Sequence, residues 1–210
     1  MKRWILLIVL IAAMVGSYNW LNQTPTQLHK EEIAQKPTAE MLKSQTKATL
    51  TPGRVVELQT NKGNIDFVLF EKDCPLTTKR IAGLVAAGKY NGVKFPRVEG
   101  WVIQTDKAKA DVKPMGIEVK RGLVHAKGAV GMARTSDPNS NTSIFYILLD
   151  PQPGLNGQYT VFGRVIRGMD TVIKIKKGDV IRKATIRPLT AKDRKDFMEI
   201  LKIEAERKTE

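Results

Sequence analysis

Arg97 is the residue of this sequence whose surroundings are best suited to chemistry. It follows Phe95 and Pro96, and Gln104 lies seven residues further along. The residues between the two polar groups are mostly apolar or aromatic, with Glu99 and Gly100 among them. A guanidinium keeps its charge at any working pH and donates hydrogen bonds from a rigid fork. One fixed cation among apolar and amide groups suits a reaction that needs electrostatic stabilisation without a covalent bond to the enzyme.

The sequence lacks the motifs of covalent and metal catalysis. It contains no Gly-x-Ser-x-Gly elbow, no Gly-x-x-x-x-Gly-Lys phosphate loop and no Cys-x-x-Cys pair. His29 and His125 are far apart without ligand-type neighbours, so we expect no metal site and interpret His125 as a surface loop histidine. Cys74 is the only cysteine, and we interpret it as a small, partly buried apolar residue. No cofactor is expected.

Four segments, in this order, resemble those of the cyclophilins, which are peptidyl-prolyl cis/trans isomerases. They cover residues 94–104, 128–134, 143–147 and 154–163, and the resemblance extends over roughly 55–187. It implies a mainly β fold, a closed eight-stranded antiparallel barrel capped by two helices. It also implies an enzyme that isomerises X-Pro bonds in polypeptides.

The resemblance gives nine residues a role. Arg97 corresponds to the arginine that contacts the substrate proline, and Gln104 to the glutamine that hydrogen-bonds the substrate backbone. The others belong to the proline pocket (Trp101, Val102, Tyr146, Leu155 and Tyr159) and to the segment that pairs with the peptide (Ala133 and Arg134).

The sequence departs from the family pattern around these residues. Arg97 and Gln104 are seven residues apart, where the family usually has eight, so the loop that carries Glu99 is shortened. Thr105-Asp106 follow the glutamine in place of two glycines. Gly154 stands where many members have a tryptophan, so we expect weak binding of cyclosporin-type ligands.

Prolyl isomerisation is slow because amide resonance sets a barrier of about 18–20 kcal/mol. Twisting the bond leaves the imide nitrogen more basic. The Arg97 guanidinium could hydrogen-bond that nitrogen or hold the neighbouring carbonyl. Shortening the isomerisation time from tens of seconds to milliseconds requires an acceleration of about 10⁴-fold. This corresponds to lowering the barrier by roughly 5.5 kcal/mol, which one arginine and an apolar pocket could supply.

The pattern of short elements fits such a site. Alternating residues predict paired strands at 55–60 and 64–69, with a turn at Asn61-Lys62-Gly63. Pro75 opens a predicted helix that Gly88 ends, and a second helix is predicted at 168–175. The other predicted strands are 93–95, 101–104, 129–133, 145–149, 160–165 and 180–186. Many short strands with two helices indicate a capped barrel.

The N-terminal residues 1–21 indicate export. Lys2 and Arg3 precede an uncharged apolar run that has signal-peptide length if it ends at Val15. Counted on through Trp20, the run approaches the roughly 20 residues of a spanning helix. We favour a retained anchor over a cleaved signal peptide, and both remain open. In either case we expect a membrane-tethered or secreted protein with its domain on the extracytoplasmic side.

Three further regions follow. Residues 22–53 are too polar to bury a core and are interpreted as a flexible linker. The cyclophilin-like domain is predicted at 54–188, and a charged helical tail at 189–210. Thr190 can cap this helix, with Asp193 in its first turn and Phe197 and Leu201 on one face. The helix either packs on the barrel or forms a mobile tail.

The formal net charge of +14 predicts attraction to anionic lipid or acidic proteins, or simply a solvated surface. Nucleic-acid-binding motifs are absent, so no nucleic acid partner is expected. The expected partners are proline-containing polypeptides and, through the N-terminal segment, the membrane; a monomer is expected. We predict an isomerase that assists the folding of exported proteins. The alternative is a non-catalytic cyclophilin-like peptide-binding or assembly module.

Overall fold

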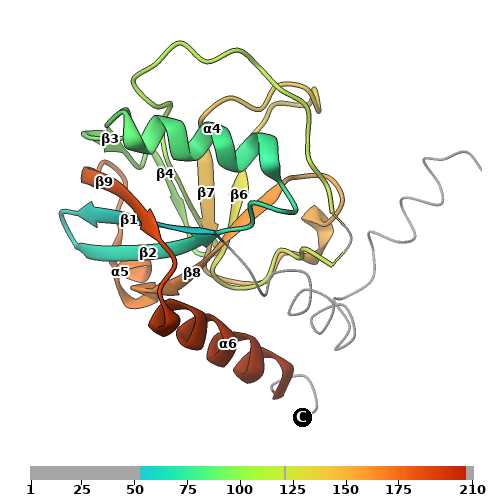
Figure 1. The fold of residues 1–210 in the computed structure, drawn as a ribbon. Helices are drawn as coiled ribbons and strands as arrows, with labels where there is room; N and C mark the ends of the chain where they lie inside the picture. The colour runs from blue at the N-terminus through green and yellow to red at the C-terminus, as the bar shows by residue number, and fades with distance from the viewer. Residues whose placement is uncertain (1–52, 121, 207–210) are drawn as a thin grey trace, which may run out of the picture. The chain divides into compact units, whose positions relative to one another are not determined.

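The computed structural model describes residues 53–120 and 122–206. Nine strands in this part of the chain form one antiparallel sheet, in the spatial order β3-β9-β1-β2-β8-β6-β7-β5-β4 (Figure 1). The strands are β1 (Arg54–Thr60), β2 (Gly63–Leu69), β3 (Val93–Lys94), β4 (Arg97–Glu99), β5 (Val102–Gln104), β6 (Ala129–Met132), β7 (Phe145–Leu148), β8 (Val161–Arg167) and β9 (Val180–Pro188). The mainly β class is confirmed, and a strand is present at each predicted position, whereas β4 was not predicted.

The predicted closed eight-stranded barrel is wrong in strand number and in closure. The edge strands β3 and β4 are consecutive in sequence and are separated only by Phe95-Pro96. Proline has no N–H to donate to a ladder, so the single strand expected at 93–95 ends early and β4 begins beyond it. The backbone N–H of Asp106, after β5, donates to the Lys94 carbonyl at 2.9 Å. The sheet is therefore an open barrel whose two edges remain near each other.

The barrel interior is filled by aromatic rings from several strands. Phe145 on β7 contacts the rings of Phe67, Tyr90 and Phe162 at centroid distances of 5.9, 5.4 and 6.4 Å. The Tyr90 hydroxyl donates to the Ser143 carbonyl at 2.6 Å, so its polar end is satisfied inside the core. Phe145 faces this core, and the next residue of β7 consequently faces the other side of the sheet.

The two predicted helices of the domain are confirmed as α4 (Pro75–Ala86) and α5 (Met169–Lys174), and Figure 1 shows α4 above the strands and α5 beside β2. Proline in the first turn of α4 loses no helical hydrogen bond. The Glu118 carboxylate accepts the backbone N–H groups of Leu76 at 3.0 Å and Thr77 at 2.6 Å. A side chain distant in sequence therefore caps this helix and ties the long loop after β5 to it.

The C-terminal helix α6 (Ala191–Glu206) packs against the barrel, which decides between the two alternatives for the predicted tail. Thr190 and Asp193 cap its start reciprocally: Asp193 accepts from the Thr190 backbone N–H, and the Asp193 N–H donates to the Thr190 hydroxyl. Phe197 and Leu201 are buried, and the ring of Phe197 lies 6.1 Å from that of Phe70. The helix belongs to the folded domain.

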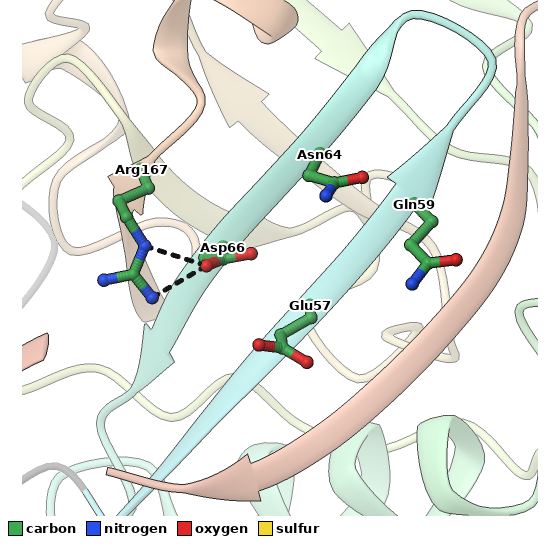
Figure 2. Close-up of a pocket in the computed structure, with 5 residues that line it drawn as sticks. All are labelled: Glu57, Gln59, Asn64, Asp66 and Arg167. Carbon is green, nitrogen blue, oxygen red and sulfur yellow. Dashed lines mark hydrogen bonds and ion pairs between the residues drawn. The ribbon is translucent and has the colours of Figure 1, made fainter. Parts of the chain in front are cut away.

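Ion pairs attach this helix to the outer face of the sheet. Arg167 donates to Asp66 on β2 and to both Asp193 and Asp196 on α6, at 2.7 to 2.8 Å in its shortest contacts. Arg187 on β9 also pairs with Asp193. A recess of about 370 Å³ beside these pairs is shown in Figure 2, and it is lined by Glu57, Gln59, Asn64, Asp66 and Arg167. Its charged groups join the helix to the sheet, which is a structural role.

No helix in the described part of the chain is long and apolar enough to cross a membrane. The predicted apolar segment 1–21 and nearly all of the predicted linker 22–53 lie outside the described residues.

Candidate active site

One transverse row of the sheet contains the central residues of the predicted site. Arg97 on β4 pairs with Gln104 on β5, which pairs with Tyr146 on β7, which pairs with Gly131 on β6. Residues directly opposite each other in antiparallel strands project from the same face. The pairing of these strands therefore brings a guanidinium, an amide and a phenol ring together on one surface.

The Arg97 guanidinium is held on three sides. Its Nε donates to Glu99 Oε1 at 2.7 Å, its Nη2 donates to Glu99 Oε2 at 3.2 Å, and its Nη1 donates to Gln104 Oε1 at 3.3 Å. Its Cζ lies 5.2 Å from the centre of the Trp101 ring, within the range of a cation–π interaction. The side chain is still 43% exposed, so it is oriented and accessible.

The shortened loop is a two-residue connection. Glu99 pairs with Val102 across β4 and β5, so Gly100 and Trp101 alone join the strands. Trp101 is half-buried and packs against the core, and its carbonyl accepts the Leu149 N–H at 2.8 Å. Its ring supports the guanidinium, a contact that the predicted pocket role did not include.

Val102 lies two residues before Gln104 on β5 and shares its face of the strand. It is buried and pairs with Leu148 on β7. Val102 therefore lies on the same face of the sheet as Gln104 and Tyr146, and its contact with a substrate proline stays a prediction.

Tyr146 is part of a buried hydrogen-bond chain that the sequence did not reveal. Its hydroxyl lies 2.8 Å from His125 Nε2, and His125 Nδ1 lies 3.0 Å from Asn156 Oδ1. Asn156 Oδ1 also accepts the backbone N–H of His125 at 2.9 Å, so this atom is the acceptor in its contact with His125 Nδ1. Nδ1 therefore carries the proton, and Nε2 accepts from the tyrosine.

The interpretation of His125 as a surface residue was wrong, because the side chain is 1% exposed. Burial lowers the pKa of His125 to about 4, so the imidazole is neutral at physiological pH. Burial likewise raises the pKa of Tyr146, which keeps its hydroxyl protonated. The chain of Tyr146, His125 and Asn156 thus fixes the orientation of the phenol ring without adding charge to the site.

A second cation stands at the far side of the tyrosine. Tyr159 contacts Tyr146 edge to face at 6.3 Å, and the Arg134 guanidinium carbon lies 4.4 Å from the centre of the Tyr159 ring. Arg134 also donates from Nε to the Gln158 carbonyl at 3.0 Å and from Nη1 to the Thr135 carbonyl at 2.8 Å. Backbone acceptors orient this cation but do not neutralise its charge.

The remaining predicted residues lie on the loops around this row. Ala133 follows β6 and its N–H donates to the Ile144 carbonyl at 2.9 Å. Leu155 ends the short 3₁₀ helix Pro153–Leu155, and its carbonyl accepts the Tyr159 N–H at 3.3 Å. Their contacts with a bound peptide stay predictions.

Cys74 takes no part in this surface. It is fully buried, its thiol lies 3.3 Å from the Val161 carbonyl, and burial raises its pKa well above the usual value for a thiol. A thiol in that state is a poor nucleophile. The interpretation of Cys74 as a packing residue is confirmed, with deeper burial than expected.

Comparison with known proteins matches this chain to one family. The family model described as cyclophilin type peptidyl-prolyl cis-trans isomerase/CLD matches residues 55–201. A probable peptidyl-prolyl cis-trans isomerase of Brucella suis is 38% identical over 151 residues, which are 64% of this chain and 77% of the relative. A peptidyl-prolyl cis-trans isomerase of Acinetobacter baylyi is 39% identical over 133 residues, or 58% of this chain and 71% of the relative.

Solved structures agree with the family assignment. A cyclophilin-type isomerase of Cryptosporidium parvum matches with a TM-score of 0.59 and 25% identity, over 66% of this chain and 99% of the other. A second structure of that isomerase, obtained in the presence of the dipeptide Ala-Pro, matches with a TM-score of 0.58 and 28% identity, over 63% and 98%. With its row of Arg97, Gln104 and Tyr146 on an open β-barrel, this chain belongs to the cyclophilin-type peptidyl-prolyl cis-trans isomerases.

Proposed function

We propose that Arg97 is the catalytic residue of this isomerase and that the substrate proline binds over the row formed with Gln104 and Tyr146. The observation that carries the proposal is the register of β4, β5 and β7, which sets these three residues side by side on one face. The arginine is the cation of this row, and it is accessible from solvent.

The reaction needs a group that favours the twisted amide over the planar one. In the planar amide the nitrogen lone pair is delocalised into the carbonyl. In the twisted state the lone pair is localised, and an Arg97 N–H can donate to it. This bond forms only as resonance is lost, so it stabilises the transition state more than the substrate. No proton is transferred, because the guanidinium keeps its protons at any working pH.

Neighbouring residues hold the peptide while the bond rotates. Val102 and Tyr146 form the apolar base for the proline ring, with Leu155 and Tyr159 at its side. The Gln104 amide is proposed to hydrogen-bond the substrate backbone, because its Nε2 can donate while its Oε1 accepts from Arg97. Ala133 and Arg134 follow the C-terminal end of β6 and are proposed to pair with the extended peptide.

The proposed substrates are exported polypeptides with X-Pro bonds, in unfolded chains or extended loops. The Ala-Pro dipeptide used with the Cryptosporidium parvum isomerase supports a proline-containing ligand. Export is supported by the sequence alone, through the basic and apolar residues 1–21. We propose that this segment is retained as an anchor and that the isomerase domain acts as a monomer on the extracytoplasmic side.

A refolding assay limited by proline isomerisation tests the catalytic role. The wild-type protein should accelerate the slow phase, and Arg97→Ala should lower kcat/KM about 100-fold, equivalent to roughly 2.7 kcal/mol. Arg182→Ala, which removes an exposed arginine from β9, is the matched control and should leave the rate unchanged. Equal rates for wild type and Arg97→Ala would refute the assignment.

Membrane retention is tested separately by fractionation and N-terminal sequencing of the native protein. A retained anchor gives a membrane-bound chain that begins at or near Met1. A soluble chain that begins near Ser17 would show that the segment is a cleaved signal peptide.

A peptide-binding or assembly role is the second candidate, and one observation favours it. The Arg97 guanidinium already has a carboxylate partner in Glu99, which reduces the field that it can apply to a substrate. Binding of a proline peptide by a wild-type protein that gives no acceleration would support this role.

A further inference from the structure

We propose that Glu99 is a positioning residue, which holds the Arg97 guanidinium in the orientation required for isomerisation. The inference rests on the catalytic role proposed for Arg97. It concerns a carboxylate that reaches the arginine because the connection between β4 and β5 is short.

The geometry of the pair leaves the working end of the guanidinium accessible. Glu99 binds the side of the fork, through Nε and one N–H of Nη2. Gln104 takes one N–H of Nη1. An arginine has five N–H groups, so these three bonds leave one on Nη1 and one on Nη2. Because Glu99 binds side-on through Nε and Nη2, the remaining N–H of Nη2 lies at the end of the fork. Glu99 therefore fixes the plane of the group without covering the end that would meet the substrate.

The short hairpin places the carboxylate at this position. Glu99 is two residues after Arg97 on β4, and residues i and i+2 of a strand project from the same face. Its own pairing with Val102 closes the connection after Gly100-Trp101. One more residue between Arg97 and the acid would direct it to the other face.

Trp101 contacts both members of the Arg97–Glu99 ion pair. The charged group that faces the Glu99 carboxylate is Arg97, and the Trp101 indole is a further donor to it. The hydrogen bond from Arg97, followed by smaller contributions that include Trp101, holds the pKa of Glu99 below its usual value. Trp101 also lies against the guanidinium. The three side chains form one unit, and the carboxylate is ionised at working pH.

The pair contributes little to folding. Both side chains are more than 40% exposed, at 43% for Arg97 and 45% for Glu99, and exposed ion pairs add little net stability. A long arginine side chain nevertheless samples many rotamers unless it is held. Loss of Glu99 should therefore change the order of the guanidinium and the rate of catalysis while the fold keeps its stability.

The test compares Glu99→Ala and Glu99→Gln with wild type. Glu99→Ala should lower kcat/KM about 10-fold, lower the NMR order parameter of the Arg97 Nε–H and leave the melting temperature unchanged. Glu99→Gln retains an oxygen acceptor for one hydrogen bond, so its kcat/KM and its Arg97 order parameter should fall between those of wild type and Glu99→Ala. Glu199→Ala on α6 removes an exposed carboxylate elsewhere and controls for the change in net charge.

Two results would overturn the inference. An unchanged or increased kcat/KM in Glu99→Ala would show that the carboxylate is idle or competes with the substrate. A lower kcat/KM with an unchanged Arg97 order parameter would show that Glu99 acts by another route. Loss of activity in Arg97→Ala with full activity in Glu99→Ala would reject this inference alone, whereas equal activity in wild type and Arg97→Ala would reject the proposed function itself.

Discussion

The Tyr146 ring lies directly over Gly131, its cross-strand partner on β6, and occupies the space that a side chain at that position would need. A Cβ on Gly131 would fall 2.6 Å from Cε2 of the tyrosine and closer still to Cζ and the hydroxyl. Glycine at this position therefore permits the ring to lie flat at the base of the proposed proline site. The hydroxyl reaches His125 from this orientation.

Replacing Gly131 should displace the tyrosine. We expect Gly131→Ala to destabilise the protein by about 1–3 kcal/mol, as overpacking of a filled site does, and to lower kcat/KM. Urea unfolding and the refolding assay measure the two effects. Gly83→Ala on α4 is the control, since a Cβ there meets nothing within 4 Å, and it should not destabilise. A neutral Gly131→Ala variant would mean that the ring is free to move.

The buried histidine should make stability depend on pH above the range in which carboxylates titrate. Unfolded histidine has a pKa of about 6.5, and His125 in the fold has a pKa of about 4 because of burial. Between these values the unfolded chain binds more protons than the folded one, so stability falls as pH falls. Between pH 7 and pH 5 the loss should be about 2 kcal/mol.

His125→Gln provides the comparison for this prediction, measured by urea unfolding at both pH values. Glutamine can still accept from the Tyr146 hydroxyl but does not titrate. The only other histidine of the chain is His29, which lies before the described domain. A variant that retained the full wild-type dependence between pH 7 and pH 5 would contradict the assignment to His125.

Asp193 should be the main electrostatic attachment of α6. Hydrogen bonds from Arg187 lead the effects that hold the pKa of Asp193 far below its usual value, and those from Thr190 and Arg167 add to them. Its stabilisation is therefore present above the unfolded pKa of about 3.9 and lost as pH falls below it. This pH range lies below the range in which protonation of His125 lowers the stability.

We expect Asp193→Asn to destabilise the protein by about 2–3 kcal/mol, since two partly buried arginines lose their shared partner. Thermal unfolding at pH 7 measures the change. Asp196→Asn is the matched control: Asp196 is 24% exposed and lies near the same Arg167, so its loss should cost about 1 kcal/mol or less. Similar losses for both variants would show that burial of Asp193 is not decisive.

Gly154→Trp should strengthen binding of cyclosporin-type ligands while changing turnover little. A tryptophan supplies an N–H donor and a large apolar face that glycine lacks. Gly154 is exposed, and a Cβ there meets nothing within 4 Å, so the substitution should not disturb the fold. We expect the inhibition constant to fall about 5- to 150-fold, equivalent to 1–3 kcal/mol. Nanomolar inhibition of the unmodified protein would refute the assignment of this position.

The strands and helices were predictable because local pattern governs them. Alternation identified β1 and β2, and Pro75 and Gly88 bracketed α4. The open edge between β3 and β4 was harder to see, because it depends on the missing N–H of Pro96 within a run that otherwise reads as one strand. The docking of α6 depends on Phe70 and Arg167, which are distant in sequence, so the helix pattern alone left two alternatives open.

The site was predictable where it follows motifs and was missed where it depends on contacts between distant residues. Arg97, Gln104 and Tyr146 are brought together by register, as the resemblance implied. His125 was misread because its partners, Tyr146 and Asn156, are 21 and 31 residues away. The charge of Glu99, two residues from Arg97 at the end of β4, was a visible signal for their pairing.

The position of β9 has a consequence for how the chain folds. This strand is the last of the sheet in sequence, yet it lies between β3 and β1 and pairs with both. During synthesis, β1 and β3 therefore lack this partner until the chain has been made as far as about Pro188. Pairing over so long a separation is slow to form, so the nascent domain should remain incomplete until its C-terminal part emerges. A protein proposed to act on unfolded chains is therefore itself incompletely folded during most of its synthesis.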